Sequence, residues 1–158
     1  MATPNTTFVS GAILTAAEMN NLPFGVVSRK YDTAATLTVN STTETELLTS
    51  PAFTPVAGRL YRLTYSIGFI AKTNNLGNIE IHMRKDNTTG TILNNSYYSA
   101  LGLNIYVPFS TSVLLTSTQM GTASFIPSLC LVANTSGFVA GNTGGFNGTI
   151  LFEDIGSA

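Results

Sequence analysis

Apolar and polar residues alternate with a period of two along most of this 158-residue chain. In residues 58–72, GRLYRLTYSIGFIAK, every second side chain is large and apolar: Tyr61, Leu63, Tyr65, Ile67 and Phe69. Successive side chains of a β-strand point to opposite faces of its sheet, so this pattern predicts a long strand with one buried face. We expect further long strands where the alternation recurs, in residues 78–86, 105–115, 123–134 and 148–156.

Turn-forming residues separate these strands, with Asn, Asp, Thr and Gly gathered at 74–77, 86–90 and 142–145. Shorter strands are expected at 25–31, 35–40 and 45–53. No second helical period interrupts them, so the pattern predicts an all-β fold. We expect an antiparallel, jelly-roll-like β-sandwich, with an immunoglobulin-like sandwich as the alternative. Pro108 and Pro127 fall inside strand patterns and indicate sheet edges or bulges there.

Few residues are candidates for a catalytic or metal-binding site, and none is expected to be catalytic. His82, the only histidine, lies between Glu80 and Arg84 on the polar side of its strand, where a lone histidine is usually an exposed surface residue. Glu44 and Glu46 share one face of a possible short strand. Their spacing of about 7 Å would suit a glycosidase pair, but nothing else nearby supports catalysis, so an exposed edge is favoured.

The remaining candidates are a cysteine and a Gly-rich stretch. Cys130 stands in an apolar strand without a neighbouring His or basic residue in the sequence, which predicts a buried, inert thiol. Residues 137–148, GFVAGNTGGFNG, contain no Lys and open no helix, so they lack the features of a phosphate-binding loop. We expect a flexible loop that presents Phe138 and Phe146, and a chain with no catalytic residue, metal ligand or cofactor.

Composition narrows the possible partners. Charged residues make up 9% of the chain, and the net charge is -1, so the basic surface that nucleic-acid binding requires is missing. Apolar runs are far shorter than the roughly 18 residues of a membrane span, and the first residues lack the pattern of a secretory signal. Hydrophobic residues reach 44%, with consecutive apolar runs at 113–115 and 129–132, which favours self-association.

The stretch 11–27, GAILTAAEMNNLPFGVV, departs from the β pattern and predicts one short helix. Thr15 and Glu18 form a capping box, and Leu14 and Met19 supply the hydrophobic staple around it. Because Pro23 disfavours helix at the residue before it, the helix ends by residue 21.

A helix this short is not stable alone, so its apolar side chains need an external surface. We therefore assign residues 1–27 to an attachment arm and 28–158 to the β-sandwich domain. The residues assigned to anchoring are Leu14, Thr15, Glu18, Met19, Leu22 and Phe24.

Three segments together resemble small structural proteins of tailed bacteriophages, often described as minor tail proteins. Residues 11–25 match a Gly-Ala-x-Leu-Thr-Ala-x-x-Met-Asn-x-Leu-Pro-x-Gly pattern. Residues 58–62 match a Gly-Arg-x-Tyr-Arg entry into a long strand, and residues 152–156, FEDIG, match a closing Val-Glu-Asp-Ile-Gly. Phe24 departs from the basic residue expected between Pro and Gly in this family.

The resemblance implies a non-enzymatic protein of the virion, on the tail or on the capsid as a decoration or head fibre. Its partners would be other virion proteins and copies of itself, as a homotrimer by analogy with phage fibres. The alternative is an adhesin head that binds a receptor or host-surface glycan. The residues expected to stack on sugars there, from loop tips, are Tyr97, Tyr98, Phe138 and Phe146.

Overall fold

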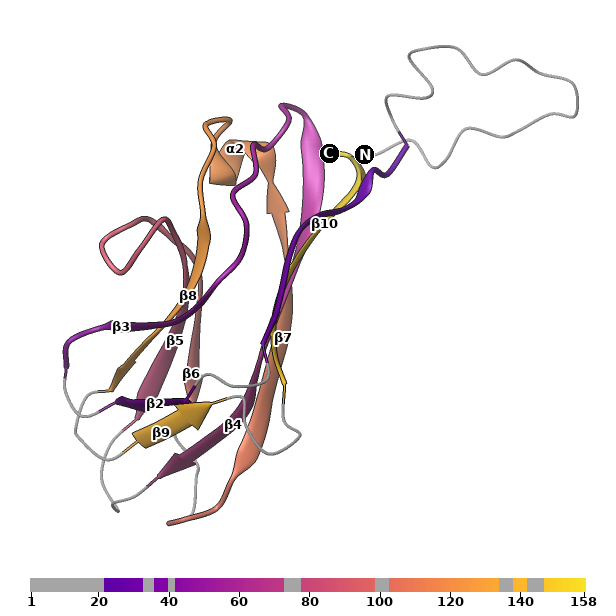
Figure 1. The fold of residues 1–158 in the computed structure, drawn as a ribbon. Helices are drawn as coiled ribbons and strands as arrows, with labels where there is room; N and C mark the ends of the chain where they lie inside the picture. The colour runs from indigo at the N-terminus through magenta and orange to yellow at the C-terminus, as the bar shows by residue number, and fades with distance from the viewer. Residues whose placement is uncertain are drawn as a thin grey trace, which may run out of the picture.

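The computed structural model describes residues 22–32, 36–39, 42–72, 78–98, 103–133, 138–141 and 147–158. Almost all of the regular structure in these residues is β-strand, and Figure 1 shows the strands in two facing layers. The elements are β1 (Gly25–Asp32), β2 (Thr36–Val39), β3 (Thr45–Thr49), β4 (Arg59–Lys72), β5 (Ile79–Lys85), β6 (Ile92–Tyr98), β7 (Val107–Thr116), α2 (Ser117–Met120), β8 (Pro127–Ala133), β9 (Phe138–Gly141) and β10 (Gly148–Ser157).

The strands form two antiparallel sheets. The larger sheet has six strands in the order β1-β10-β4-β9-β2, with β7 also paired to β4, and the smaller has the order β3-β8-β5-β6. β4 is the centre of the larger sheet, because it pairs with β10, β7 and β9 along its 14 residues. The predicted antiparallel, jelly-roll-like β-sandwich is confirmed.

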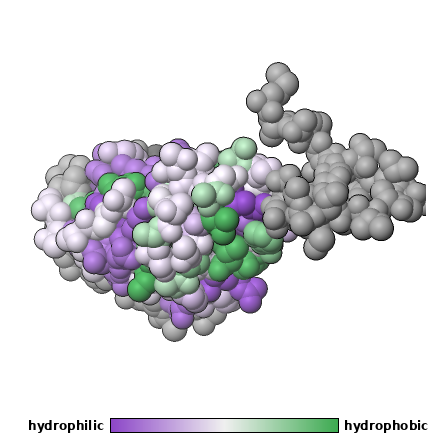
Figure 2. Space-filling model, turned by 90° about the horizontal axis from the view of Figure 1, so that it is seen from above, coloured by the Kyte–Doolittle hydropathy of each residue, from purple (hydrophilic) through white to green (hydrophobic). Residues whose placement is uncertain are grey.

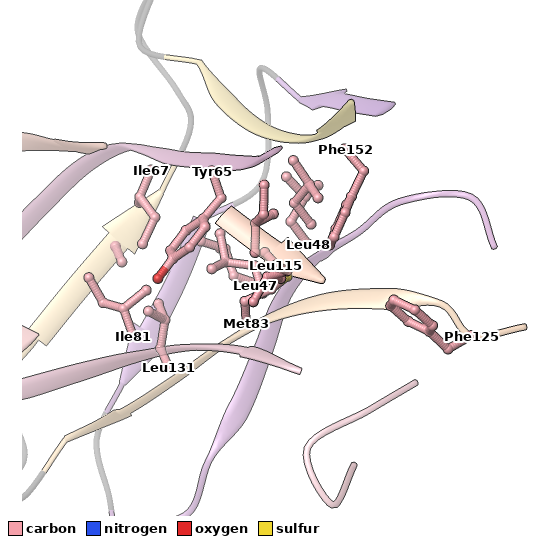
Figure 3. Close-up of a cluster of buried hydrophobic side chains, with 14 of the residues drawn as sticks. Leu47, Leu48, Tyr65, Ile67, Ile81, Met83, Leu115, Phe125, Leu131 and Phe152 are labelled. Carbon is pink, nitrogen blue, oxygen red and sulfur yellow. The ribbon is translucent and has the colours of Figure 1, made fainter. Parts of the chain in front are cut away.

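One hydrophobic core fills the space between the sheets (Figure 3). On β4, Tyr61, Leu63, Tyr65 and Ile67 are each 1% exposed or less, as their alternation predicted. The smaller sheet contributes residues of β5 and β8 with the same alternation, namely Ile79, Ile81, Met83, Leu129 and Leu131.

Phe69 is buried as predicted, at 7% exposed, but it lies outside the core cluster. The pairing of β4 with β7 shifts by one residue between Ile67 and Ile70, so Ile70 takes the next place in the core cluster. The Phe69 ring instead packs edge-on against Tyr106, with 5.3 Å between ring centroids. Pro108 lies opposite this shift on β7, which confirms the irregularity that the proline indicated.

Other expectations need correction. The segment 138–141 was expected to be a loop but is strand β9, which joins β2 to β4. Residues 92–98 form strand β6, so Tyr97 and Tyr98 lie on a strand and not on a loop tip. Helix α2 was not expected, although Thr116 and Gln119 form the same kind of capping box as the one predicted in the arm.

Candidate functional site

The described parts of the three segments that carry the sequence resemblance meet at one end of the sandwich. Gly25 lies opposite Asp154 across the pairing of β1 with β10, and Gly156 lies opposite Leu60 across the pairing of β10 with β4. Residues 22–25, 58–62 and 152–156 therefore form one structural unit, which we call the arm end.

A buried ion pair holds the arm end together. Arg59, at the start of β4, and Asp154, on β10, are 4% and 1% exposed. The Arg59 Nε donates to both carboxylate oxygens of Asp154, at 3.1 and 2.9 Å, and Nη2 donates to Oδ1 at 2.5 Å. The backbone N–H of Gly156 also donates to Oδ1, at 3.0 Å. A buried charge pair is tolerated when such bonds satisfy its polar atoms.

The same arginine fixes the root of the arm. Its Nη2 also donates to the carbonyl oxygen of Leu22, at 2.5 Å, and the Phe24 ring lies over the guanidinium carbon at 4.4 Å from its centroid. An aromatic face attracts a cation at this distance. Phe24 thus replaces the expected basic residue with a ring that stacks on Arg59, and a second cation there would repel the guanidinium.

The loop before β4 is shaped to support this arrangement. Gly58 has a φ of 73°, a left-handed conformation that costs glycine little. Its N–H donates to Ser117 Oγ at 3.0 Å, and its carbonyl accepts from the N–H of Ala158 at 2.8 Å. The C-terminus is thereby tied to the same end of the molecule as the root of the arm (Figure 1).

Exposed apolar side chains surround the arm end. Phe24, Val26, Val56 and Leu114 are all more than half exposed, and Leu22 is 36% exposed. Val26 and Leu114 flank the surface ion pair of Arg62 and Glu153, whose Nε and Oε2 atoms are 2.8 Å apart. Figure 2, seen from above the view of Figure 1, shows hydrophobic surface in this region.

The predicted anchoring residues fall partly within this site. Leu22 and Phe24 lie at the arm end and are accessible. Leu14, Thr15, Glu18 and Met19, together with the predicted helix, lie outside the described residues. Strand β1 begins at Gly25, so the last three residues assigned to the arm belong to this strand, and Gly25 and Val26 pair with β10.

His82 and Glu44 are not exposed surface residues as expected. His82 is 5% exposed on the outer side of the smaller sheet, where Nδ1 faces Glu44 Oε1 at 2.9 Å and Nε2 faces Glu80 Oε2 at 3.2 Å. Arg84 donates from Nε and Nη2 to the two oxygens of Glu44, at 2.6 Å each. Glu46, by contrast, is exposed as predicted.

This polar cluster connects the chain before β3 to β5. Its hydrogen bonds offset the cost of burying the Glu44 carboxylate. Burial raises the pKa of Glu44, but hydrogen bonds from Arg84 and His82 outweigh that effect and lower the pKa below its ordinary 4.5. Glu44 and Glu80 contact the two ring nitrogens of His82, and Arg84 binds Glu44. The polar side chains of the cluster therefore bind one another, which suits a structural role. Sequence spacing alone could not reveal it, because Glu44 and His82 are 38 residues apart.

Cys130 is buried, as predicted. Burial raises the pKa of its thiol to about 12, and the nearby charges of Glu44 and Glu46 add to the rise. A thiol is nucleophilic only as the thiolate, so this side chain is poorly suited to catalysis. Within the described residues, no three His, Cys, Asp or Glu side chains are grouped to hold a metal ion. No helix in that part of the chain is long and apolar enough to span a membrane.

Aromatic and apolar side chains are exposed at the far end, where β4 finishes at Lys72. Asn104 donates its N–H to the Lys72 carbonyl at 2.8 Å, and this contact holds a short exposed segment against the strand. The exposed large side chains there are Tyr97, Leu103, Ile105 and Tyr106. Tyr98 instead packs its ring against Phe109, with 6.1 Å between centroids.

The structure describes little of the other two predicted recognition residues. Phe138 begins β9, and Phe146 lies outside the described residues.

Comparison with solved structures finds the same fold in viral capsid proteins. The VP2 subviral particle of infectious bursal disease virus aligns with a TM-score of 0.55 at 10% sequence identity, covering 98% of this chain and 37% of that chain. The Gt strain of the same virus aligns with a TM-score of 0.47 at 8% identity, covering 98% of this chain and 47% of that chain. Bacillus endospore appendages, which form disulfide-linked pili, align with a TM-score of 0.39 at 11% identity, covering 96% of this chain and all of theirs.

At these identities the likeness is one of fold. This chain spans little more than a third of the length of the VP2 chain, so the likeness covers one part of that protein. No protein-family model matches the chain. A search of curated proteins finds no match either.

Proposed function

We propose that this chain is a non-enzymatic structural protein of a virus particle, carried on the tail or the capsid surface. The N-terminal arm attaches it to the particle, and the β-sandwich is displayed. The tailed-phage assignment comes from the sequence resemblance. The particle assignment is supported independently by the shared fold with a capsid protein.

The observation that carries the proposal is the contact of Arg59 with Asp154 and Leu22. A buried ion pair fixes the place where the arm leaves the sandwich, although residues 22–24 make no strand pairing of their own. An attachment arm needs such a fixed root, since otherwise force on the arm would peel β1 from β10. The exposed Phe24 and Val26 beside it supply apolar surface that a particle shell would cover.

The side chains that could act as an acid, a base or a nucleophile are buried or bound to other side chains, which favours a structural role over catalysis. The Cys130 thiol is held protonated by burial. His82 and Glu44 are bound to each other and to Arg84. A general acid or base must be free to meet a substrate.

The test is incorporation into particles. A tagged full-length chain and a chain lacking residues 1–21 are expressed in cells that produce the particle, and particles are isolated on a density gradient. This truncation keeps every described contact of Leu22 and Phe24. We expect the full-length chain in the particle fraction, and the truncated chain folded by circular dichroism but absent from particles. Immunogold labelling then separates a tail from a capsid location.

The far-end variant Tyr106→Ala serves as the matched control, because it removes an exposed aromatic residue distant from the arm end. It should enter particles like the full-length chain. A full-length chain that never co-sediments with particles would contradict the proposal. A truncated chain that incorporates normally would contradict the role of the arm.

Recognition of a host-surface glycan is a second candidate, favoured by Tyr97 and Tyr106 exposed at the end away from the arm. Aromatic rings stack on the apolar faces of sugars. Binding to a glycan array that Tyr97→Ala and Tyr106→Ala both weaken would support this function. Tyr98 is a poor candidate, since it packs against Phe109.

A further inference from the structure

We propose that the free edge of β7 pairs with β7 of a second copy, so that two large sheets join across a twofold axis. Within the described residues, β7 pairs with β4 alone. Its other side therefore presents backbone N–H and C=O groups at every second residue. Those groups are the template for another antiparallel strand.

β7 lacks the features that normally protect an edge. It is ten residues long and carries no charge. Its one proline, Pro108, lies near the start, opposite the register shift in β4, and leaves residues 109–116 regularly paired on the inner side. A long edge without charge, proline or bulge is prone to accept another strand.

The other edges of the sandwich are protected, which singles out β7. β1 carries Arg29, Lys30 and Asp32 and has a register shift near its start. β2 is only four residues long, and β3 has five residues with Glu46 and a register shift. The pairing of β6 is also irregular, opposite the step from Met83 to Arg84.

The sequence of β7 is compatible with itself in antiparallel pairing. Residues 109–115 can pair with the same residues of a second copy around a centre at Ser112. Phe109 then lies opposite Leu115 on the core side, and Thr111 lies opposite Val113. On the outer side Ser112 meets its own copy, so hydroxyl faces hydroxyl and no charge is desolvated. This matching is why the proposed occupant is a second copy of the chain.

The contact is small, so it is expected to be weak in dilute solution. One strand from each copy falls below the roughly 1,000 Å² typical of a stable interface. Copies attached side by side on a particle would have a high effective concentration, which strengthens a weak contact. We expect dimerisation in solution between about 1 μM and 1 mM, corresponding to roughly −8 to −4 kcal/mol.

The test measures the mass of the purified full chain by sedimentation over that range. We expect the mass to rise from 16.7 kDa toward twice that value. Ser112→Lys places two lysines opposite each other and should weaken the dimer about tenfold or more, because like charges in directly opposed positions repel. A mixture of Ser112→Lys and Ser112→Glu chains should recover dimers, since the opposed charges then attract.

Thr64→Lys is the matched control. Thr64 and Ser112 share one hydroxyl hydrogen bond of 3.1 Å, so either substitution removes that bond and adds the same charge to the same face. Thr64 lies on β4, one strand away from the edge, so its lysine should leave dimerisation unchanged. Amide exchange of the wild-type chain adds a measurement free of any folding defect: β7 amides should exchange more slowly as concentration rises, and β1 amides should not.

A chain that stays monomeric to about 1 mM overturns the proposal. So does a Ser112→Lys chain that dimerises like wild type, or a trimer in which β7 amides gain no protection. A trimer formed through another surface is compatible with the β7–β7 contact. Two such trimers would then join through β7, and the mass would rise to that of six copies. Loss of particle incorporation by Ser112→Lys with a monomeric wild type would instead mean that the edge accepts a strand of another protein. These solution measurements involve no particle, so they succeed or fail separately from the attachment role.

Discussion

Replacing Asp154 with alanine should be among the most damaging single changes in the sandwich. The substitution removes the carboxylate that accepts three hydrogen bonds from Arg59 and one from Gly156. The Arg59 side chain, 5% exposed, would be left as a buried cation without the carboxylate that balances its charge. Breaking a buried ion pair by removing one partner typically costs about 3–5 kcal/mol.

The size of the effect can be expressed as a melting temperature. A domain of this length loses about 2–4 °C for each kcal/mol, so Asp154→Ala should melt about 6–20 °C below wild type. Urea titration of the same variant should lower the midpoint without changing the slope, because the change affects stability and not the surface exposed on unfolding.

The double variant Arg59→Met, Asp154→Leu separates stability from attachment. Replacing both charges with apolar side chains of similar volume is often neutral or stabilising, so most of the lost stability should return. The bond to Leu22 and the stacking with Phe24 are still lost. We therefore expect a stable sandwich whose residues 22–24 are cut more readily by protease, and which enters particles less efficiently.

Two outcomes would refute this reasoning. If Asp154→Ala lowers the free energy of unfolding by less than about 1 kcal/mol, Arg59 must bind water or another acceptor without penalty. A double variant no more stable than the single one would mean that the pair matters through its geometry and not through an uncompensated charge. Glu153→Ala provides the comparison, since its ion pair with Arg62 lies at the surface, where solvent screens the charges, and its loss should change stability little.

Two further predictions concern the smaller sheet. The Glu44 contact lowers the pKa of that carboxyl below 4.5, so its stabilisation is present above pH 4.5 and is lost as pH falls through the folded-state pKa. Urea titrations across this range should show the advantage of wild type over Glu44→Gln shrinking in acid, and a constant difference would contradict the assignment. The Cys130 thiol, with a pKa raised to about 12, should resist a disulfide reagent at about pH 8 until the chain is unfolded. Rapid labelling of the folded chain would count against its burial.

The strand pattern could be predicted because it depends on local periodicity. Tyr61, Leu63, Tyr65 and Ile67 are buried as their spacing indicated. Phe69 is buried too, at 7% exposed, but a one-residue shift in the pairing of β4 with β7 gives its place in the core cluster to Ile70. Nothing in the sequence near Phe69 marks that shift, although Pro108 on the partner strand indicated it from the other side.

The polar residues were harder to predict, because burial of a charged side chain depends on partners far along the chain. His82 alternates with Ile81 and Met83, and the pattern correctly placed it on the outer face of its sheet. The pattern could not show that Glu44 and Arg84 would cover it there. Isolated polar residues on an outer face can thus belong to a closed cluster, and only the fold reveals the cluster.

At the arm end, the sequence identified the segments but not the long-range contact that joins them. Sequence resemblance identified three segments without indicating why they belong together. Their common feature is one ion pair, which joins Arg59 and Asp154 although they are 95 residues apart in the chain. Each segment then has a physical reason to persist: the first offers the Leu22 carbonyl and the Phe24 ring, the second the guanidinium, and the third the carboxylate. Loss of any one leaves a buried polar group without its partner, so the three segments are expected to change together or not at all.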